Sequence, residues 1–178
     1  LTPIRPSGGA LDGQGNPLPG VQVGFQVGSG GGSGLGAANV TSNVAGIAQV
    51  GGWVLGVTAG PNVLTAIVPG VPTVAFAAQG VPAVATSMVA ASPIALSGFL
   101  GNFLAALPEV RLTDAVGNPV GGQSVTFAVT GGGGQVAGTS GLTNYDGRVA
   151  VGAWRLGGAA ASQTLQASTV GVPSISFT

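Results

Sequence analysis

The ionisable side chains limit the chemistry that this chain can perform. Its 178 residues include four Arg and four acidic residues, and no His, Lys or Cys. General acid–base catalysis at neutral pH depends mostly on His, Lys or a carboxylate with a shifted pKa. A Ser or Thr nucleophile needs such a base beside it. We therefore assign no catalytic residue and expect that the chain is not an enzyme.

The acidic residues are also poor candidates for a metal or cofactor site. Ca²⁺ takes about six to eight oxygen ligands, commonly including several carboxylates. Asp114 with Asp146 or Glu109 would supply at most a calcium site with few carboxylate ligands. Asp12 and Asp114 each begin a segment that continues into Gly-Asn-Pro, and an Asp in such a turn usually accepts backbone N–H bonds. We favour the turn role and expect no metal and no cofactor.

Two other binding chemistries are disfavoured. The glycine-rich runs at 30–34 and 131–134 are not followed by the Lys-Ser/Thr pair of a phosphate-binding loop, so they are interpreted as loops or hairpin ends. Nucleic acid binding needs a basic stripe. Four Arg balanced by four acidic residues do not provide one, and no nucleic acid partner is expected.

The charges are distributed unevenly. No charged residue occurs from Gly13 through Pro108, although soluble proteins average about 25% charged residues. We expect neighbouring subunits, glycans or both to cover such a surface. The most apolar stretch, 81–107, is interrupted by Pro and Gly, so it lacks the ~18 unbroken apolar residues of a membrane span.

The sequence contains an internal repeat. Residues 12–17 recur at 114–119, a spacing of 102 residues, and Trp53 recurs as Trp154, a spacing of 101. Solenoid repeats are about 20–50 residues long, so this period predicts tandem domains. Recurrence of large aromatic residues at equivalent positions favours core packing over a sugar-binding platform.

The local pattern predicts β-structure. Apolar residues alternate with small or polar ones at 21–27, 64–68, 125–129 and 165–169, which places the apolar side chains on one face of each strand. The 35 Gly and 12 Pro residues disfavour long helices and fall mainly between these runs. The prediction is an all-β chain of two β-sandwiches.

Several segments, taken in order, carry a resemblance to a known family. They are Val110 to Phe127, with its Asp-Ala-Val-Gly-Asn-Pro turn, then a glycine run, Thr143 to Gly147, Trp154 to Gly157, and Leu165 to Ala167. This set resembles the bacterial immunoglobulin-like domain of the invasin/intimin type. The resemblance implies extracellular sandwiches strung in arrays on surface proteins. That family shares no catalytic or cofactor site, so no functional residue is carried over.

The resemblance and the repeat together define two tandem immunoglobulin-like β-sandwich domains. Residues 78–178 match one full unit, which includes a leader at 81–107 that we expect to hold its first strand. Residues 1–77 match the same pattern without its beginning. Two periods of 101 residues would need 202 residues, and the chain has 178. The first domain is therefore expected to lack an edge strand and to expose an open flank of its core.

The open flank leads to an assembly hypothesis. We expect a neighbouring copy to fill it by strand addition or domain swapping, which would give a head-to-tail polymer. The expected donor is the uncharged leader, whose apolar residues are Met88, Val89, Ile94, Leu96, Phe99, Leu100, Phe103 and Leu104. The alternative is that the chain, which starts at Leu1 without a signal-peptide pattern, was cut from a longer array.

Asn39 is a candidate glycosylation site, because Asn39-Val40-Thr41 is the only Asn-x-Ser/Thr sequence and follows a glycine-rich segment where a surface loop is expected. O-linked glycans on Ser and Thr are the alternative.

Three function classes remain. The favoured one is a structural extracellular protein, a subunit of a self-assembling surface filament or fibre. The others are a stalk or adhesive binding module of a bacterial surface adhesin, and a spacer attached to a secreted enzyme. All three are extracellular or on the cell surface.

Overall fold

The computed structural model describes residues 4–159 and 162–178, which divide into two compact units, Leu1–Val81 and Pro82–Thr178. Between these limits the described residues form strands and loops without a helix, so the all-β prediction is confirmed. Strand β8 ends at Gly80, so the first unit continues past residue 77, the boundary predicted from the sequence.

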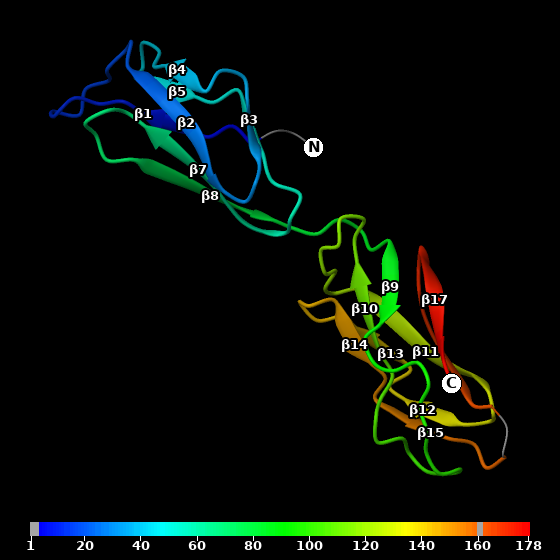
Figure 1. Ribbon diagram of the computed structural model, residues 1–178. Coiled ribbons are helices and arrows are strands. Elements are labelled where there is room, and N and C mark those ends of the chain that lie inside the picture. Colours follow the sequence, from blue (N-terminus) through cyan, green and yellow to red (C-terminus); the bar gives the residue numbers. More distant parts are fainter. Residues whose placement is uncertain (1–3, 160–161) are drawn as a thin grey trace. The chain divides into compact units, whose positions relative to one another are not determined.

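Unit 1 holds three antiparallel sheets (Figure 1). The largest has the order β4-β2-β7-β8, and the others pair β1 with β5 and β3 with β6. The strands are β1 Ser7–Gly9, β2 Gln22–Ser29, β3 Ser33–Leu35, β4 Asn39–Thr41, β5 Ile47–Gln49, β6 Gly52–Val54, β7 Gly60–Ile67 and β8 Val74–Gly80.

Unit 2 has corresponding sheets and one more strand. The four-stranded sheet has the order β13-β11-β16-β17, β12 pairs with β15, and the third sheet is β14-β10-β9. The strands are β9 Ser87–Ala90, β10 Glu109–Thr113, β11 Ser124–Gly131, β12 Gln135–Ala137, β13 Ser140–Leu142, β14 Arg148–Ala150, β15 Ala153–Arg155, β16 Thr164–Thr169 and β17 Val172–Phe177.

The core of each unit follows the predicted alternation. Val23 and Phe25 of β2 are buried, as are Val125 and Phe127 of β11. The two tryptophans, the largest buried side chains of their units, are also in the cores. Burying a large aromatic ring removes about 150–250 Å² from water, so these residues serve packing.

The leader at 81–107 holds one strand, as expected. Its only strand is β9, which pairs antiparallel with β10. Residues 91–108 run without a further strand, apart from an isolated bridge between Phe103 and Arg155. Strand β10 therefore has a neighbour on both edges, β9 and β14.

Candidate assembly surface

Strand β1 is the counterpart of β10, but it is paired on one edge only. It pairs with β5 through Ser7 and Gln49, Gly8 and Ala48, and Gly9 and Ile47. No strand of the described residues takes the place that β9 has beside β10. An edge strand with unpaired N–H and C=O groups is a template for pairing with another chain.

In unit 2 the corresponding edge of β10 is occupied by β9. The hydrogen bonds of β10 on that edge therefore indicate which backbone groups of β1 face its open edge. The carbonyl oxygen of Glu109 accepts bonds from the N–H groups of Ala91 and Ser92 at 2.7 and 3.3 Å, and that of Thr113 accepts one from Thr86 at 2.9 Å. The residues 102 positions earlier than Glu109 and Thr113 are Ser7 and Leu11. Both are exposed.

Pro6 and Ala10, which alternate with Ser7, Gly9 and Leu11 along the chain, direct their backbone groups to other segments of unit 1. The N–H of Val50 donates to the carbonyl oxygen of Pro6 at 3.1 Å, and the N–H of Ala10 donates to that of Gly46 at 2.7 Å. Backbone groups alternate in direction along a strand, so the groups of Ser7, Gly9 and Leu11 point to the open edge.

The flank of the core next to this edge is also more open in unit 1. Val71 is 58% exposed, whereas its counterpart Val172 is 8% exposed. Phe76 is half-buried, whereas Phe177 is fully buried. The cause is the leader, because Met88 and Leu104 join the core cluster that contains Val172 and Phe177.

Two inward positions near β1 carry smaller residues than their counterparts. Gly8 stands where unit 2 has Val110, and Ala10 stands where it has Leu112. Val110 and Leu112 are fully buried. Unit 1 therefore buries less apolar surface along this sheet, and each missing CH₂ group forgoes about 0.8 kcal/mol of hydrophobic stabilisation.

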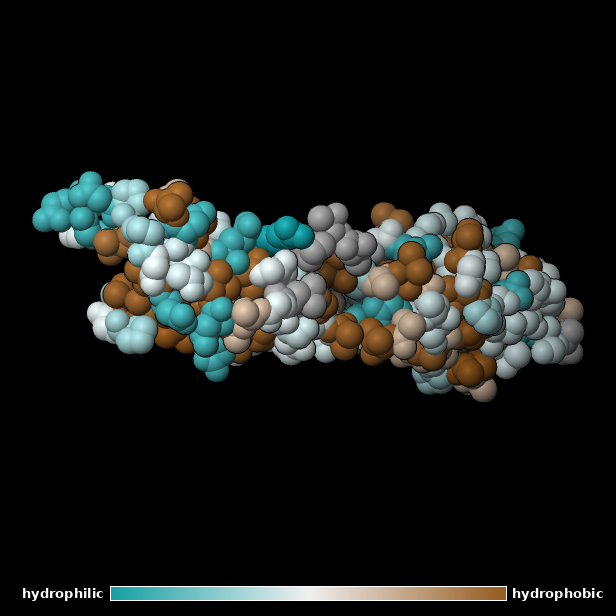
Figure 2. All heavy atoms as spheres, turned by 90° about the horizontal axis from the view of Figure 1, so that it is seen from above, coloured by the Kyte–Doolittle hydropathy of each residue, from teal (hydrophilic) through white to brown (hydrophobic). Residues whose placement is uncertain are grey.

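The predicted donor residues fall into two sets. Met88 and Leu104 are buried in unit 2, and Leu96 packs against the same cluster while its N–H donates to the carbonyl oxygen of Thr178 at 2.7 Å. The remaining five are exposed: Val89, Ile94, Phe99, Leu100 and Phe103. The face drawn in Figure 2 shows that hydrophobic residues, in brown, reach the surface of the chain between polar ones.

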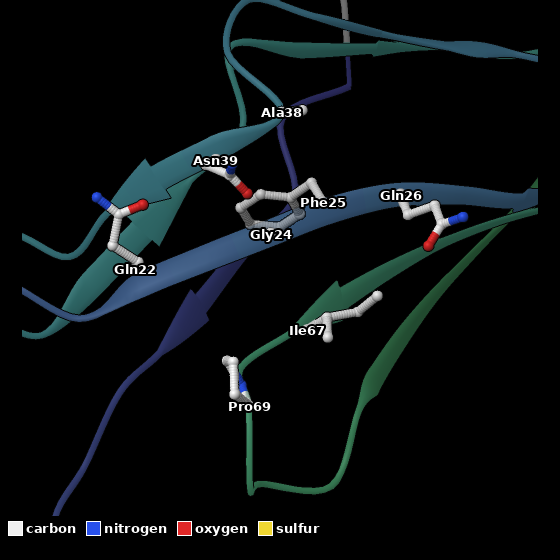
Figure 3. A pocket seen from close by; sticks show the side chains of 8 residues that line it. All are labelled: Gln22, Gly24, Phe25, Gln26, Ala38, Asn39, Ile67 and Pro69. Atoms are coloured by element: carbon white, nitrogen blue, oxygen red, sulfur yellow. The ribbon is translucent and has the colours of Figure 1, made fainter.

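Asn39 lies on the edge strand β4, whereas the sequence predicted a loop. The strand forms because Val40 pairs with Val23 of β2 and packs against the core of unit 1. The side chain of Asn39 is exposed and faces a shallow groove lined by Gln22, Gly24, Gln26 and Ile67 (Figure 3). Gly24 keeps this groove open, because a Cβ there would lie 3.2 Å from Oδ1 of Asn39.

The two predicted Asp turns are present. Oδ1 of Asp12 accepts the N–H groups of Gln14 and Asn16 at 2.9 and 2.8 Å, and Oδ2 accepts Nδ2 of Asn16 at 2.9 Å. The side-chain bond from Asn16 is the main reason that the pKa of Asp12 is lowered. Gly15 has φ 86° and closes the turn, a conformation that favours glycine.

The same turn in unit 2 makes an additional bond to the leader. Asp114 accepts the N–H groups of Val116 and Asn118 at 3.0 and 2.9 Å on Oδ1, and Nδ2 of Asn118 at 2.9 Å on Oδ2. The N–H of Ala83 adds a 3.0 Å bond to Oδ2. The bond from the Asn118 side chain is the main cause of the lowered pKa of Asp114, and burial partly opposes it.

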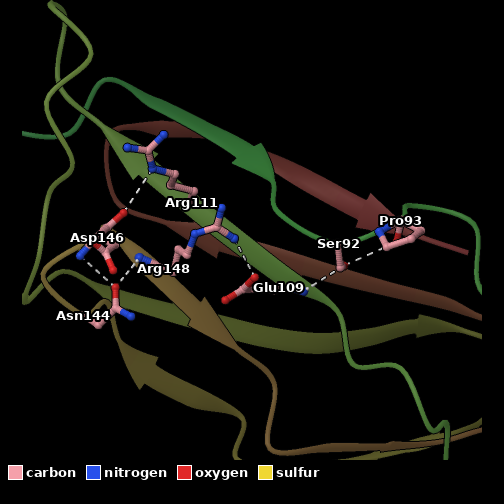
Figure 4. Close-up of polar contacts among 7 residues, drawn as sticks. All are labelled: Ser92, Pro93, Glu109, Arg111, Asn144, Asp146 and Arg148. Carbon is pink, nitrogen blue, oxygen red and sulfur yellow. Dashed lines mark hydrogen bonds and ion pairs between the residues drawn. The ribbon is translucent and has the colours of Figure 1, made fainter.

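Most other charged groups of unit 2 hold strands and loops together (Figure 4). Nη1 of Arg148 on β14 lies 2.8 Å from Oε2 of Glu109 on β10, and Nε of Arg111 donates to the carbonyl oxygen of Asp146 at 3.1 Å. Nε of Arg155 donates to the carbonyl oxygen of Gly101 at 2.6 Å. These contacts use the charges to connect neighbouring elements.

A buried amide at one equivalent position in each unit was not predicted from the sequence. Oδ1 of Asn62 accepts the N–H of Gly56 at 2.9 Å, and Oε1 of Gln163 accepts the N–H of Gly157 at 2.8 Å. Both amides are buried. The recurrence of an amide residue after 101 positions is the signal that would have identified them.

Within residues 4–159 and 162–178 no group of three or more His, Cys, Asp or Glu residues is placed to hold a metal ion. The same part of the chain has no helix long and apolar enough to cross a membrane.

Comparison with known proteins identifies the fold. No protein-family profile matches the sequence, and no curated protein matches it. The Escherichia coli adhesin FdeC has a TM-score of 0.64 and 20% identity, with 93% of this chain and 55% of the FdeC chain covered. The D0-D1 domain of intimin has a TM-score of 0.40 and 19% identity over 99% of this chain and 90% of that one. Invasin, a bacterial integrin-binding protein, has a TM-score of 0.43 and 21% identity over 99% of this chain and 35% of that one.

The similarity to FdeC shows that the chain has an immunoglobulin-like β-sandwich fold. The fold predicted from the ordered segments of the sequence is therefore confirmed. The chain spans about half of the FdeC chain.

Proposed function

We propose that residues 1–178 form a non-catalytic stalk module of a bacterial surface adhesin, located outside the cell. The supporting observation is the fold similarity to the adhesin FdeC, which extends over 93% of this chain. Arrays of sandwiches suit a stalk, because each unit folds around its own core and the units add length. The large aromatic residues Trp53, Trp154, Phe127 and Phe177 are used for these cores.

An exchange experiment separates a stalk from an adhesive module. In the surface protein that carries this chain, residues 1–178 are replaced by two unrelated immunoglobulin-like units of equal length, and attachment of cells to their target is measured. If residues 1–178 are a stalk module, attachment should be unchanged in the exchanged protein. Attachment of a protein from which residues 1–178 are deleted is measured for comparison. Loss of attachment in the exchanged protein would instead assign adhesion to this chain, where Phe99, Phe103 and Tyr145 are exposed aromatic residues.

Localisation has its own test. An antibody against the 178-residue chain should label intact cells. Labelling of lysed cells alone would contradict the proposal.

A filament subunit is the second candidate, and the open edge of β1 favours it. In this proposal the leader of one copy fills the flank of unit 1 in the next, giving a head-to-tail polymer. However, Met88 and Leu104 would have to leave the core of their own unit 2. Each transfer then opens one flank while it closes another, so it brings no net gain in buried surface.

A further inference from the structure

A glycine lies in the middle of β2 without a local backbone reason. Gly24 pairs with Asn39 of β4 on one side and with Ile67 of β7 on the other. A glycine inside a strand weakens it, and it often marks a bulge, a bend, or the close approach of a ligand or another backbone. The register is regular at Gly24, because the shift in β2 lies between Val27 and Ser29, and its φ is not positive. Neither a bulge nor a turn explains this glycine.

No backbone from outside the sheet lies against Gly24 in the described part of the chain. A Cβ built on Gly24 would meet two atoms within 4 Å, Oδ1 of Asn39 at 3.2 Å and the carbonyl oxygen of Ile67 at 3.7 Å. Both atoms belong to the neighbouring strands of the same sheet. The groove of Figure 3 lies over them, with a volume of about 480 Å³. Small-ligand sites are commonly about 300–1,000 Å³, so room for a ligand is the remaining reason for the glycine.

Unit 2 shows that the fold does not require a glycine at this position. Thr126 stands there on β11, and it pairs with Ser140 on one side and Ser168 on the other. These pairs are the counterparts of the two pairs that Gly24 makes. A threonine side chain therefore fits the same place in the same sheet.

Three amide side chains surround the groove of unit 1. Gln22 and Gln26 lie on the solvent face of β2, and Asn39 lies beside them on β4 (Figure 3). All three are exposed, and within the described part of the chain none of their amides is hydrogen-bonded. Unit 2 has Ser124 and Ala128 at the positions of the two Gln residues. The strand glycine and its flanking amides thus occur together in unit 1 and are replaced together in unit 2.

The lining of the groove selects an uncharged ligand that carries hydroxyl groups. An amide offers both a donor and an acceptor, and so does a hydroxyl group. No charged residue lines the groove, so a charged ligand would find no counter-charge there. A purely apolar ligand would leave the amides without partners. Ala38, Ile67 and Pro69 complete the lining and can contact the C–H face of a ring.

An extended peptide fits this groove less well. A peptide strand adds to a sheet through unpaired backbone groups at its edge. The groove lies over β2, which has β4 on one side and β7 on the other. The backbone groups of β2 are therefore used within the sheet, and side chains provide the polar contacts.

We propose that this groove binds an uncharged saccharide, a mono- or disaccharide unit of a glycan on another molecule. Its hydroxyl groups bond the amides of Gln22, Gln26 and Asn39, and a ring lies over Gly24. The site adds a lateral contact to the stalk and does not rest on the stalk proposal, because its test measures binding to the isolated chain. A glycan attached to Asn39 would compete for the same space, so glycosylation there would close the site.

The test uses the 178-residue chain, labelled with ¹⁵N and produced in a bacterial cytoplasm so that Asn39 carries no glycan. Two-dimensional ¹H–¹⁵N spectra are recorded while glucose, galactose, mannose, N-acetylglucosamine, N-acetylgalactosamine or lactose is added. At least one of these sugars should shift the backbone N–H signal of Gly24 and the side-chain NH₂ signals of Gln22 and Gln26. The shifts should saturate with a dissociation constant on the order of 1 mM, as expected for a ligand of this size.

The same substitution at two glycines of β2 separates the groove from the rest of the strand. Gly24→Thr introduces the residue that unit 2 has at this position and fills the groove, so it should weaken binding at least about tenfold. Gly28→Thr is the matched control, because unit 2 has Thr130 there and a Cβ would make ordinary contacts between 3.5 and 3.7 Å. Gly28 does not line the groove, so this variant should bind as the unchanged chain does. The same spectra show whether unit 1 of each variant is folded.

A second variant keeps the test decisive if Gly24→Thr does not fold. Gln22→Ser with Gln26→Ala introduces the residues of unit 2 at two exposed positions, so it should fold and also lose the binding. The proposal is overturned if none of the sugars gives saturable shifts at these residues, or if the shifts are confined to unit 2. It is also overturned if both groove variants bind as the unchanged chain does, or if Gly28→Thr loses the binding as well.

Discussion

The backbone N–H of Ala83 donates a 3.0 Å hydrogen bond to Oδ2 of Asp114. The bond connects the segment that enters unit 2 with the turn that follows β10. Asp12, the counterpart in unit 1, makes the turn bonds, and among the described residues no leader segment donates a bond to it. One carboxylate thus stabilises a turn in unit 1, and in unit 2 it also fixes the leader beside the sheet.

Removal of this carboxylate should therefore affect the two units unequally. Asp114→Ala leaves the N–H groups of Ala83, Val116 and Asn118 without their acceptor, and unpaired groups at a buried site are costly. We expect Asp114→Ala to lower the urea midpoint of unit 2 by more than Asp12→Ala lowers the urea midpoint of unit 1. The measurement is unfolding followed by the single Trp of each unit, with the other Trp replaced by Phe. Equal decreases would contradict the leader role of Asp114.

Stability should also depend on pH through these two carboxylates. Hydrogen bonds from Asn16 and Asn118 hold the pKa values of Asp12 and Asp114 below the ordinary value of 3.8. The folded state binds protons less readily than the unfolded state, so the stabilisation is fully present above that ordinary value. It is lost as the pH falls through the lowered pKa values. Urea midpoints should be level from pH 7 to about pH 5 and then decline. This decline of the urea midpoint should be smaller in the double variant Asp12→Asn with Asp114→Asn.

Gly157 should not tolerate a side chain, because a Cβ there would overlap the carbonyl oxygen of Gly132. We expect Gly157→Ala to destabilise unit 2 by about 1–3 kcal/mol, as is usual for overpacking. Gly158→Ala is the control, since a Cβ at that position meets no heavy atom within 4 Å. The free energies of unfolding are measured by urea denaturation. Equal values for the two variants would show that the backbone segments at Gly132 and Gly157 can move apart.

The equivalent phenylalanines should contribute differently. Phe177 is fully buried, and its replacement by Ala should cost about 3–5 kcal/mol. Phe76 is half-buried, so Phe76→Ala should cost less. A Phe76→Ala cost as large as that of Phe177→Ala would mean that the flank of unit 1 is covered in solution.

Glycosylation of Asn39 remains a prediction. The exposed side chain on β4 should carry a glycan on protein isolated from its native source, giving an intact mass above 16.8 kDa. Asn39→Gln should return to the mass of the bare chain if the glycan is N-linked. An excess mass that persists in Asn39→Gln would indicate O-linked glycans, and a bare mass in the unchanged protein would contradict both.

The sequence by itself determined the features that depend on short-range patterns. The alternation at Val23 and Phe25 fixed which face of β2 is buried, because successive side chains of a strand point to opposite sides. The Asp12 and Asp114 turns were also predictable, because their bonds connect residues two and four positions apart. The local patterns predicted an all-β chain of two sandwiches, and the family resemblance carried by the order of the segments implied the immunoglobulin-like fold.

Only the tertiary structure decided features that depend on contacts between distant residues. Val40 pairs with Val23, and this placed Asn39 on an edge strand where the glycine-rich sequence before it suggested a loop. The pairing of β9 with β10 likewise showed which groups of β1 face an open edge. The local pattern shows which residues form a strand, whereas the choice of a partner strand also depends on packing across the whole unit.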